Sequence, residues 1–141
     1  MSEKVMDPVL PSPVVNADSQ PYWSAARERR LVIRRCKACR ALHFMPRHLC
    51  PVCWSDELEW IDAKGTGSVH SFTIMRRASD QAFAPRVPYV VALIDLEEGP
   101  RMMANVLGDD ALDVKIGDPV EVTFEDRGAG AMLPQFKRVT G

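Results

Sequence analysis

Four cysteines in two C-x-x-C pairs constrain this chain more than any other feature. Cys36 and Cys39 form the first pair, Cys50 and Cys53 form the second, and the chain has no other cysteine. A C-x-x-C turn directs both sulfurs to one point, and two such turns supply the tetrahedral thiolate set that a structural zinc ion prefers. Iron is the minor alternative, because four-sulfur sites also suit iron. Since four sulfurs close the coordination shell, the predicted site is structural and not catalytic.

Disulfides or buried free thiols are the other uses that four cysteines could have. The N-terminus carries Glu3, Lys4 and Asp7 before Pro8, which is unlike a secretory leader, so an oxidising compartment is not expected. Nor does any apolar run approach the roughly 20 residues of a transmembrane helix. We therefore expect a cytoplasmic protein with no membrane contact.

Charge is distributed unevenly along the chain, although the net charge is only −1. Residues 91–126 are acidic, whereas residues 27–47 carry eight cations against Glu28. Four thiolates around one zinc ion leave a charge of −2, so part of this basic excess offsets the metal site. A phosphate-binding role is the alternative, and the sequence leaves both open. The cations are Arg27, Arg29, Arg30, Arg34, Arg35, Lys37, Arg40 and Arg47.

The N-terminal part reads as an arm followed by one helix. Residues 1–17 are proline-rich with little periodic pattern, which predicts an extended arm. Asp18 or Ser19 can cap a helix that starts near Pro21 and runs to about Arg30. Its apolar face is small, so the helix must pack on another element.

The remaining segments alternate as β-strands. Short strands at 31–33, 42–48 and 58–61 complete the cysteine ribbon, where His43 and His48 are expected to be exposed polar residues. Five further strands follow, with a loop at 78–87, and they predict a small closed barrel. The long first strand and helix-poor connections favour an OB-fold over an SH3-like barrel. The five strands are expected at 67–77, 89–96, 101–107, 120–124 and 133–139.

The predicted fold is therefore mainly β: an N-terminal helix, a four-cysteine zinc ribbon and a five-stranded OB-fold barrel. The predicted divisions are an arm at 1–17, the helix plus rubredoxin-like ribbon at 18–61, and the OB-fold at 62–141.

A ligand site is harder to place, because no motif for catalysis stands out. There is no glycine-rich phosphate loop, no nucleophile elbow and no telling pair of carboxylates. Arg76, Arg77 and Arg86 flank the loop that carries Phe83, and these four residues are the candidate ligand contacts. A solvated loop with scattered charge is the alternative.

Two motifs in order give a resemblance to a known family. These are P-R-x-x-C-P-x-C at 46–53 and P-Y-V-V-A-L-I-D-L-E-E-G-P-R at 88–101. The chain, from about Asp18 to Val139, resembles the rubredoxin-like zinc ribbon plus OB-fold proteins, once called domain of unknown function thirty-five and described as acyl-CoA-associated. It departs from the family pattern in two respects. Arg40 and Trp54 stand where glycine commonly follows the second cysteine of each knuckle, and Met45 stands where a proline is expected before Pro46.

The resemblance implies a non-catalytic accessory subunit that helps to bind or channel a coenzyme A thioester. The implied partners are thiolase-like enzymes, including lipid-transfer-type relatives, and hot-dog-fold hydratases, with the thioester at a shared site. The proline-rich arm and the apolar Tyr22 and Trp23 of the helix are the expected partner contacts.

A nucleic-acid-binding module is the competing hypothesis, because OB-folds and zinc ribbons recur in that role. Single-strand binders pair a basic groove with stacking aromatics, whereas here the barrel is acidic. The accessory-subunit hypothesis is therefore favoured.

Overall fold

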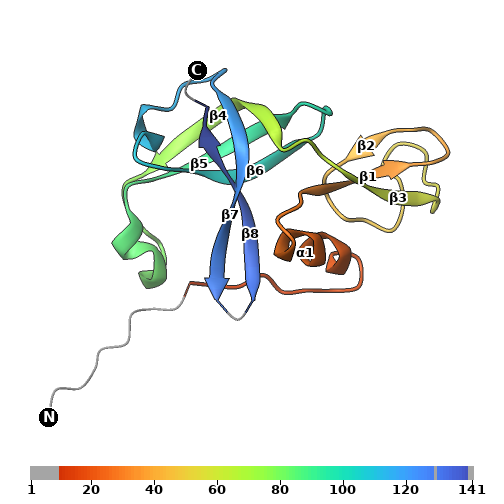
Figure 1. Ribbon diagram of the computed structural model, residues 1–141, viewed down its shortest axis with the longest axis horizontal. Coiled ribbons are helices and arrows are strands. Elements are labelled where there is room, and N and C mark those ends of the chain that lie inside the picture. Colours follow the sequence, from red (N-terminus) through yellow and green to blue (C-terminus); the bar gives the residue numbers. More distant parts are fainter. Residues whose placement is uncertain (1–9, 129, 140–141) are drawn as a thin grey trace, which may run out of the picture.

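The computed structural model describes residues 10–128 and 130–139 of this chain. Two β modules lie side by side, with helix α1 beneath the junction between them (Figure 1). One module is a three-stranded ribbon and the other is a five-stranded closed barrel. The predicted mainly-β fold with one N-terminal helix is therefore confirmed. No helix among the described residues is long and apolar enough to cross a membrane.

The described part of the arm has no regular structure until a turn leads into α1 (Gln20–Arg27). It passes the end of the barrel where β7 (Pro119–Gly128) and β8 (Ala131–Arg138) meet (Figure 1). There the carbonyl of Pro11 accepts a hydrogen bond from Arg127 at 3.0 Å. Ser19 is the N-cap residue, as the sequence predicted, but its hydroxyl accepts the N–H of Asn16 instead of a helix N–H. The Asn16 side chain in turn accepts the Ser19 N–H at 2.8 Å. Residues 1–9 of the predicted arm lie outside the described residues.

Helix α1 ends at Arg27, three residues before the expected end at Arg30. The reason is Arg29, whose left-handed backbone (φ 60°) cannot continue a helix. The helix packs on the barrel strand β8 and the ribbon strand β1, and it buries Tyr22 at 7% exposure. Tyr22 packs edge-on against Phe44 with ring centroids 5.6 Å apart. The expectation that Tyr22 contacts a partner is therefore wrong, because the chain's own core covers it.

The ribbon sheet has the strand order β2-β1-β3 and is antiparallel throughout. The second strand is much shorter than the expected 42–48, since Pro46 has no N–H to donate to a sheet. The chain turns there, with the N–H of Arg47 bonded to the carbonyl of Met45 at 2.8 Å. The ribbon strands are β1 (Val32–Cys36), β2 (Leu42–His43) and β3 (Leu58–Asp62).

His43 is buried at 9% exposure, so the expectation that it is an exposed polar residue is wrong. Neither ring nitrogen has a hydrogen-bond partner among the described residues. Burial, and then the cations of Arg34 and Arg47, lower the pKa of His43 and favour the neutral ring. His48 is exposed, as predicted.

The barrel strands close in the order β4-β5-β6-β8-β7, with β4 pairing back onto β7. Neighbours are antiparallel except β6 and β8, which pair in parallel through Val106 and Phe136. This is the five-stranded OB-fold arrangement that the sequence predicted. The strands are β4 (Thr66–Met75), β5 (Tyr89–Leu96), β6 (Arg101–Leu107), β7 (Pro119–Gly128) and β8 (Ala131–Arg138).

Strand β5 shows how the barrel core forms from alternation. Its even-numbered residues are buried and its odd-numbered residues are half-buried, as expected for a strand with one face inward. Gly67 on β4 faces the carbonyl of Asp95 so closely that a Cβ there would collide with it. Glycine is therefore required for β4 and β5 to approach each other.

Two short 3-10 helices connect the barrel strands. The first is η1 (Gln81–Arg86), in the segment expected to be a loop; the Asp80 carboxylate caps it by accepting the Ala82 N–H at 2.8 Å. The second is η2 (Ala111–Asp113), which the sequence analysis missed. Helix η1 matters for function because it places Phe83 and Arg86.

Candidate metal centre and ligand groove

The four cysteines converge at the ends of the two knuckles, with all four sulfurs within 4.8 Å of one another. Cys36 and Cys53 sulfurs lie 3.6 Å apart, and so do those of Cys39 and Cys50. A tetrahedral zinc site with Zn–S bonds of about 2.3 Å needs sulfurs about 3.8 Å apart. The donor set therefore fits one tetrahedral metal ion with a closed shell.

Backbone N–H groups support the sulfurs within each knuckle. The Cys39 N–H points to the Cys36 sulfur at 3.5 Å, and the Val52 N–H points to the Cys50 sulfur at 3.4 Å. The N–H of Cys53, and then that of Val52, lower the pKa of Cys50 to about 7. Such bonds favour thiolates, which are the form that binds metal.

The opposite pKa shift occurs at Cys53. A backbone bond from Ser55 lowers the pKa of this thiol, but burial and the neighbouring sulfurs outweigh it and raise the pKa to about 12. Sulfurs this close repel one another when ionised, so a bound cation is what makes four thiolates compatible.

Both knuckles keep the left-handed residue that closes the turn, although neither has glycine there. Arg40 and Trp54 each adopt φ 66°, and their N–H groups bond to the carbonyls of Cys36 and Cys50 at 2.8 and 2.9 Å. The departure from the family pattern therefore leaves the turn shape intact. It costs on the order of 1–2 kcal/mol at each position.

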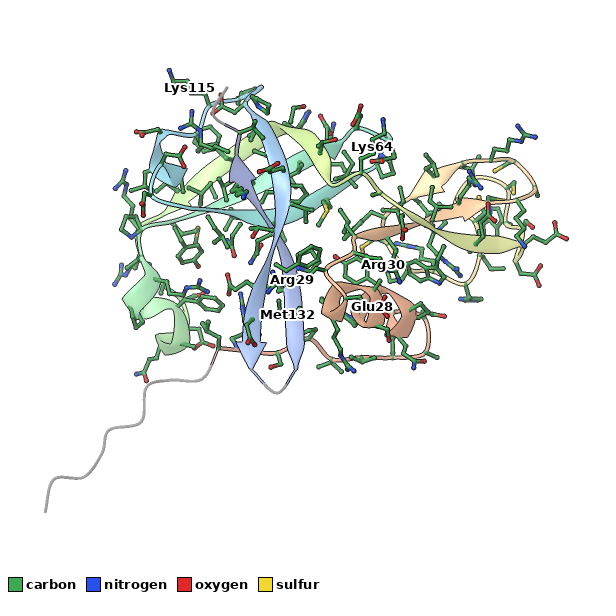
Figure 2. The ribbon with its side chains drawn as sticks, viewed as in Figure 1. Glu28, Arg29, Arg30, Lys64, Lys115 and Met132 are labelled. Atoms are coloured by element: carbon green, nitrogen blue, oxygen red, sulfur yellow. The ribbon has the colours of Figure 1, made fainter. Side chains whose placement is uncertain are left out.

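The cations of the helix and ribbon are partly paired within the chain. Arg30, labelled in Figure 2 where α1 meets the ribbon, bonds to Asp62 at 2.7 Å and also pairs with Glu28. Arg35 pairs with Glu59 on the neighbouring strand. Arg34 instead stacks over Trp60, 4.5 Å from the ring centroid. Strand β3 thus offsets part of the basic excess that the sequence showed.

Two adjacent hollows of about 250 and 290 Å³ flank Phe83 on the barrel. They share Phe83, Tyr89 and Asn105 in their linings, and we call them together the barrel groove. Arg86 lines the first hollow and Arg127 lines the second. The groove thus combines two aromatic rings with a cation at each end.

A partly buried ion-pair network fixes these cations. Arg86 makes a bidentate contact with Glu125 at 2.9 and 3.1 Å, and Arg127 also pairs with Glu125. Burial raises the pKa of Glu125, but hydrogen bonds from Arg86 and Arg127 outweigh it, and the net pKa is lowered. The Arg127 guanidinium also lies 5.7 Å from the Phe83 ring centroid.

The structure thus brings together two of the four predicted ligand contacts, Phe83 and Arg86. Arg76 and Arg77 are exposed beyond the end of β4, and they line neither hollow. Sequence reasoning missed Arg127 and Glu125, which lie about 40 residues from Arg86 in the chain.

Known protein families match the ribbon and the barrel separately. Residues 23–59 match the family described as "ChsH2, rubredoxin-like zinc ribbon domain", and residues 60–125 match "ChsH2, C-terminal OB-fold domain". A "DUF35 domain-containing scaffold protein" of Methanocaldococcus jannaschii is 36% identical over 82% of this chain and 85% of its own length. The chain belongs to the DUF35 family. The predicted resemblance is thereby confirmed.

Other DUF35 relatives have enzyme names. The "Probable enoyl-CoA hydratase alpha subunit" of Thermomonospora curvata is 38% identical over 90% of this chain, which spans only 39% of that relative's length. The "Benzoylsuccinyl-CoA thiolase subunit BbsA" of Thauera aromatica is 30% identical over 73% of this chain and 71% of its own length. A chain of the solved "Ltp2-ChsH2(DUF35) aldolase" superposes with a TM-score of 0.80 at 37% identity, covering 89% of this chain and 98% of that one.

Proposed function

We propose that this DUF35 protein is a non-catalytic accessory subunit of a thiolase-like or hydratase-like enzyme that acts on coenzyme A thioesters. One observation carries the proposal: relatives that match most of this chain are named as parts of a hydratase, a thiolase and an aldolase. These reactions differ in chemistry. Two of the names contain an acyl-CoA substrate, so the shared element is the thioester and not the reaction. A common accessory part that helps to bind or channel the thioester explains this distribution.

The scaffold names of the archaeal relatives support a placement role over a catalytic one. The ion-pair network of the barrel groove agrees with this. Arg86 and Arg127 stay protonated, as arginine does in proteins, and both are held in place by Glu125. Side chains held in this way suit the positioning of a ligand.

The barrel groove is the place where this subunit meets the thioester in our proposal. Phe83 and Tyr89 offer apolar surface, and Arg86 and Arg127 offer positive charge for an anionic ligand. Arg76 and Arg77 have no ion-pair partner among the described residues and remain available to phosphate groups. An enzyme subunit docked against the barrel would complete the site, since both hollows are shallow on their own.

The metal in our proposal is zinc, bound by Cys36, Cys39, Cys50 and Cys53. The sulfur separations fit zinc, and the closed shell makes the ion structural. Division of the chain into an arm at 1–17, a helix plus ribbon at 18–61 and an OB-fold at 62–141 also remains a proposal. The boundary between residues 59 and 60 in the family matches supports the second division.

Purification of the tagged protein from its own cells tests the proposed function. We expect a thiolase-like or hydratase-like subunit to co-purify in stoichiometric amount. Of the two, a thiolase-type partner is the stronger expectation. Deleting residues 1–10 leaves the Pro11 contact with Arg127, the Asn16–Ser19 bonds and α1 in place, so it tests the arm without removing a contact of the described fold. A clean monomer, together with no loss of acyl-CoA activity in cells that lack the protein, would contradict the proposal.

A further inference from the structure

The second knuckle exposes large apolar side chains that the fold does not use. Met45, Val52 and Trp54 are 57%, 69% and 77% exposed. A soluble domain commonly exposes single apolar residues, but three large ones between residues 45 and 54 of one small module suggest an interaction surface. These three residues belong to the segment between Phe44 and Ser55, which follows β2.

Trp54 stands out within this cluster because its position carries strain. Its backbone is left-handed, where a bulky side chain costs about 1–2 kcal/mol and glycine costs nothing. With most of its indole in solvent, Trp54 gains little burial inside this chain to offset that cost. Such strain at an exposed aromatic residue is explained if the side chain binds another molecule.

A hollow of about 410 Å³ lies beside Trp54, and we call it the knuckle hollow. Its apolar lining comes from Pro46, Leu49, Pro51 and Trp54. The hollow is large enough to receive an apolar side chain from a partner, and its proline-rich rim is already rigid. Binding would therefore order few side chains on this face.

The charges around the knuckle hollow indicate which partner fits. Between Cys36 and Ser55 the chain has three cations, Lys37, Arg40 and Arg47, and no carboxylate. Of these three cations only Arg47 lines the hollow, and Asp56 and Glu57 follow the segment in the chain. Arg47 lines the hollow with His48 and has no ion-pair partner among the described residues; Asp18 is the one carboxylate in the lining.

We infer that the knuckle hollow docks an acidic polypeptide segment: an apolar side chain enters beside Trp54, and flanking carboxylates meet Arg47. This inference rests on the proposed function only in naming the occupant's source, which is the acyl-CoA enzyme subunit. Tryptophan and arginine are the residue types that most often dominate binding energy at protein interfaces. A nucleic acid fits less well, because a single unpaired arginine in an apolar hollow offers little to a run of phosphates.

The first experiment uses synthetic peptides as probes and needs no identified partner. The acidic peptide is acetyl-Glu-Leu-Phe-Glu-amide, and its matched control replaces both glutamates by lysine. NMR of the full metal-bound chain should show shifts of the Trp54 indole and His48 signals with the acidic peptide and not with the lysine peptide. No shift, equal shifts with both peptides, or stronger shifts with oligo(dT) would overturn the inference.

The second experiment uses the complex obtained with the co-purifying enzyme subunit. Trp54→Gly removes the indole and relieves the left-handed strain, so the knuckle and its metal should persist. Arg47→Glu reverses the charge at the hollow. We expect both variants to weaken the complex by about tenfold or more, whereas Ile116→Ala, which trims an apolar side chain 71% exposed on the barrel, should not.

The two proposals fail separately. If a complex forms and Trp54→Gly binds as tightly as the unchanged protein, the docking inference is wrong while the accessory role stands. If no enzyme subunit co-purifies and cells that lack the protein keep their acyl-CoA activity, the accessory role is contradicted. The peptide experiment alone then decides whether the hollow binds an acidic segment.

Discussion

Arg40 and Trp54 occupy equivalent places in the two knuckles, and both adopt φ 66°. The family pattern predicts glycine there, and the sequence alone left open whether the turn would survive without it. It survives because each residue's N–H still bonds to the first cysteine's carbonyl, while the metal ligands on either side hold the loop. The backbone hydrogen bonds and the metal ligands of the knuckles thus offset the strain at these two residues.

We therefore predict that Arg40→Gly stabilises the ribbon. Relief of the left-handed conformation is worth about 1–2 kcal/mol, and the extra unfolded-state entropy of glycine removes about 0.5–1 kcal/mol of that. The net gain of about 0.5–1 kcal/mol should raise the thermal midpoint of the metal-bound protein. Arg40→Val is the matched control and should lower it, because a β-branched residue is strained further in this conformation.

Glu125 is the residue whose charge matters most to the barrel groove. Its side chain is 12% exposed and its folded-state pKa lies below the ordinary 4.5. Its contribution to stability is therefore present above pH 4.5 and is lost as the pH falls through the folded-state pKa. Glu125→Gln should cost about 2–4 kcal/mol at pH 7, because it leaves the buried Arg127 without its counterion.

Urea unfolding between pH 3 and pH 7 measures this effect. The unchanged protein should lose stability on acidification more steeply than the Gln variant does. Equal slopes for the two proteins would show that Glu125 titrates as an ordinary exposed carboxyl group. Glu121→Gln is a suitable control, since that side chain is 47% exposed and pairs with Lys137 at the surface.

At the level of elements, we expect the ribbon to depend on a bound metal ion and the barrel not to. Few apolar side chains hold the loop ends of the ribbon together, whereas the barrel has a continuous core around Phe136 and Ile94. We predict that Cys50→Ser loses the metal and unfolds the ribbon while the barrel strands persist. Elemental analysis and circular dichroism test this together. Full metal retention with an unchanged spectrum would show that Cys50 is not a ligand.

The same analysis measures the metal itself. Freshly purified protein should contain about one equivalent of zinc, as expected for one four-sulfur site. Iron in place of zinc would change the identity of the ion but not the site. Less than half an equivalent of either metal would contradict a permanently occupied structural centre.

Gly67 tests how tightly β4 and β5 pack. Gly67→Ala would push a methyl group into the carbonyl of Asp95, and backbone cannot move away as a side chain can. We expect a loss of about 1–3 kcal/mol in the free energy of unfolding, the usual range for overpacking. Chemical denaturation measures it, with Ser68→Ala as the neighbouring control. A loss below about 0.5 kcal/mol, the usual size of a neutral surface change, would show that the strands separate easily.

Elements with a strong local signal were predictable from the sequence. Strands β5 and β6 have the predicted bounds, because a long apolar run ending at a Glu98-Gly99 turn has few other readings. The bounds of the second ribbon strand and the helix η1 were not predicted. Pro46 shortens the strand because it has no N–H to donate to a sheet, and the Asp80 side chain caps η1 by accepting the Ala82 N–H. The convergence of the metal ligands was predictable because each knuckle is local.

The remaining parts of the site depend on contacts between distant segments. Arg86 and Glu125 are 39 residues apart and meet only because η1 folds against β7. His43 is buried in the folded ribbon, where β2 pairs with β1 and Arg34 stands opposite His43 in the register. No periodicity in the sequence records either event. The sequence therefore allowed a ligand site to be predicted near Phe83 and Arg86. It did not reveal Glu125 and Arg127, which hold the groove's cations in place.

On the scale of the whole molecule, the two modules divide the tasks that we propose. The ribbon carries the metal and the knuckle hollow, and the barrel carries the groove around Phe83. Helix α1 packs on both modules and so fixes one relative to the other. A subunit of this kind can dock through one module and present the other to a ligand held by its partner.

The most direct test of the accessory role is to measure a partner enzyme with and without this protein. The subunit that co-purifies is prepared alone, its acyl-CoA turnover is measured, and this protein is added back in increasing amounts. We predict low acyl-CoA turnover for the partner alone. The turnover should rise as this protein is added and level off at one equivalent. Turnover that is the same at every amount added would contradict it.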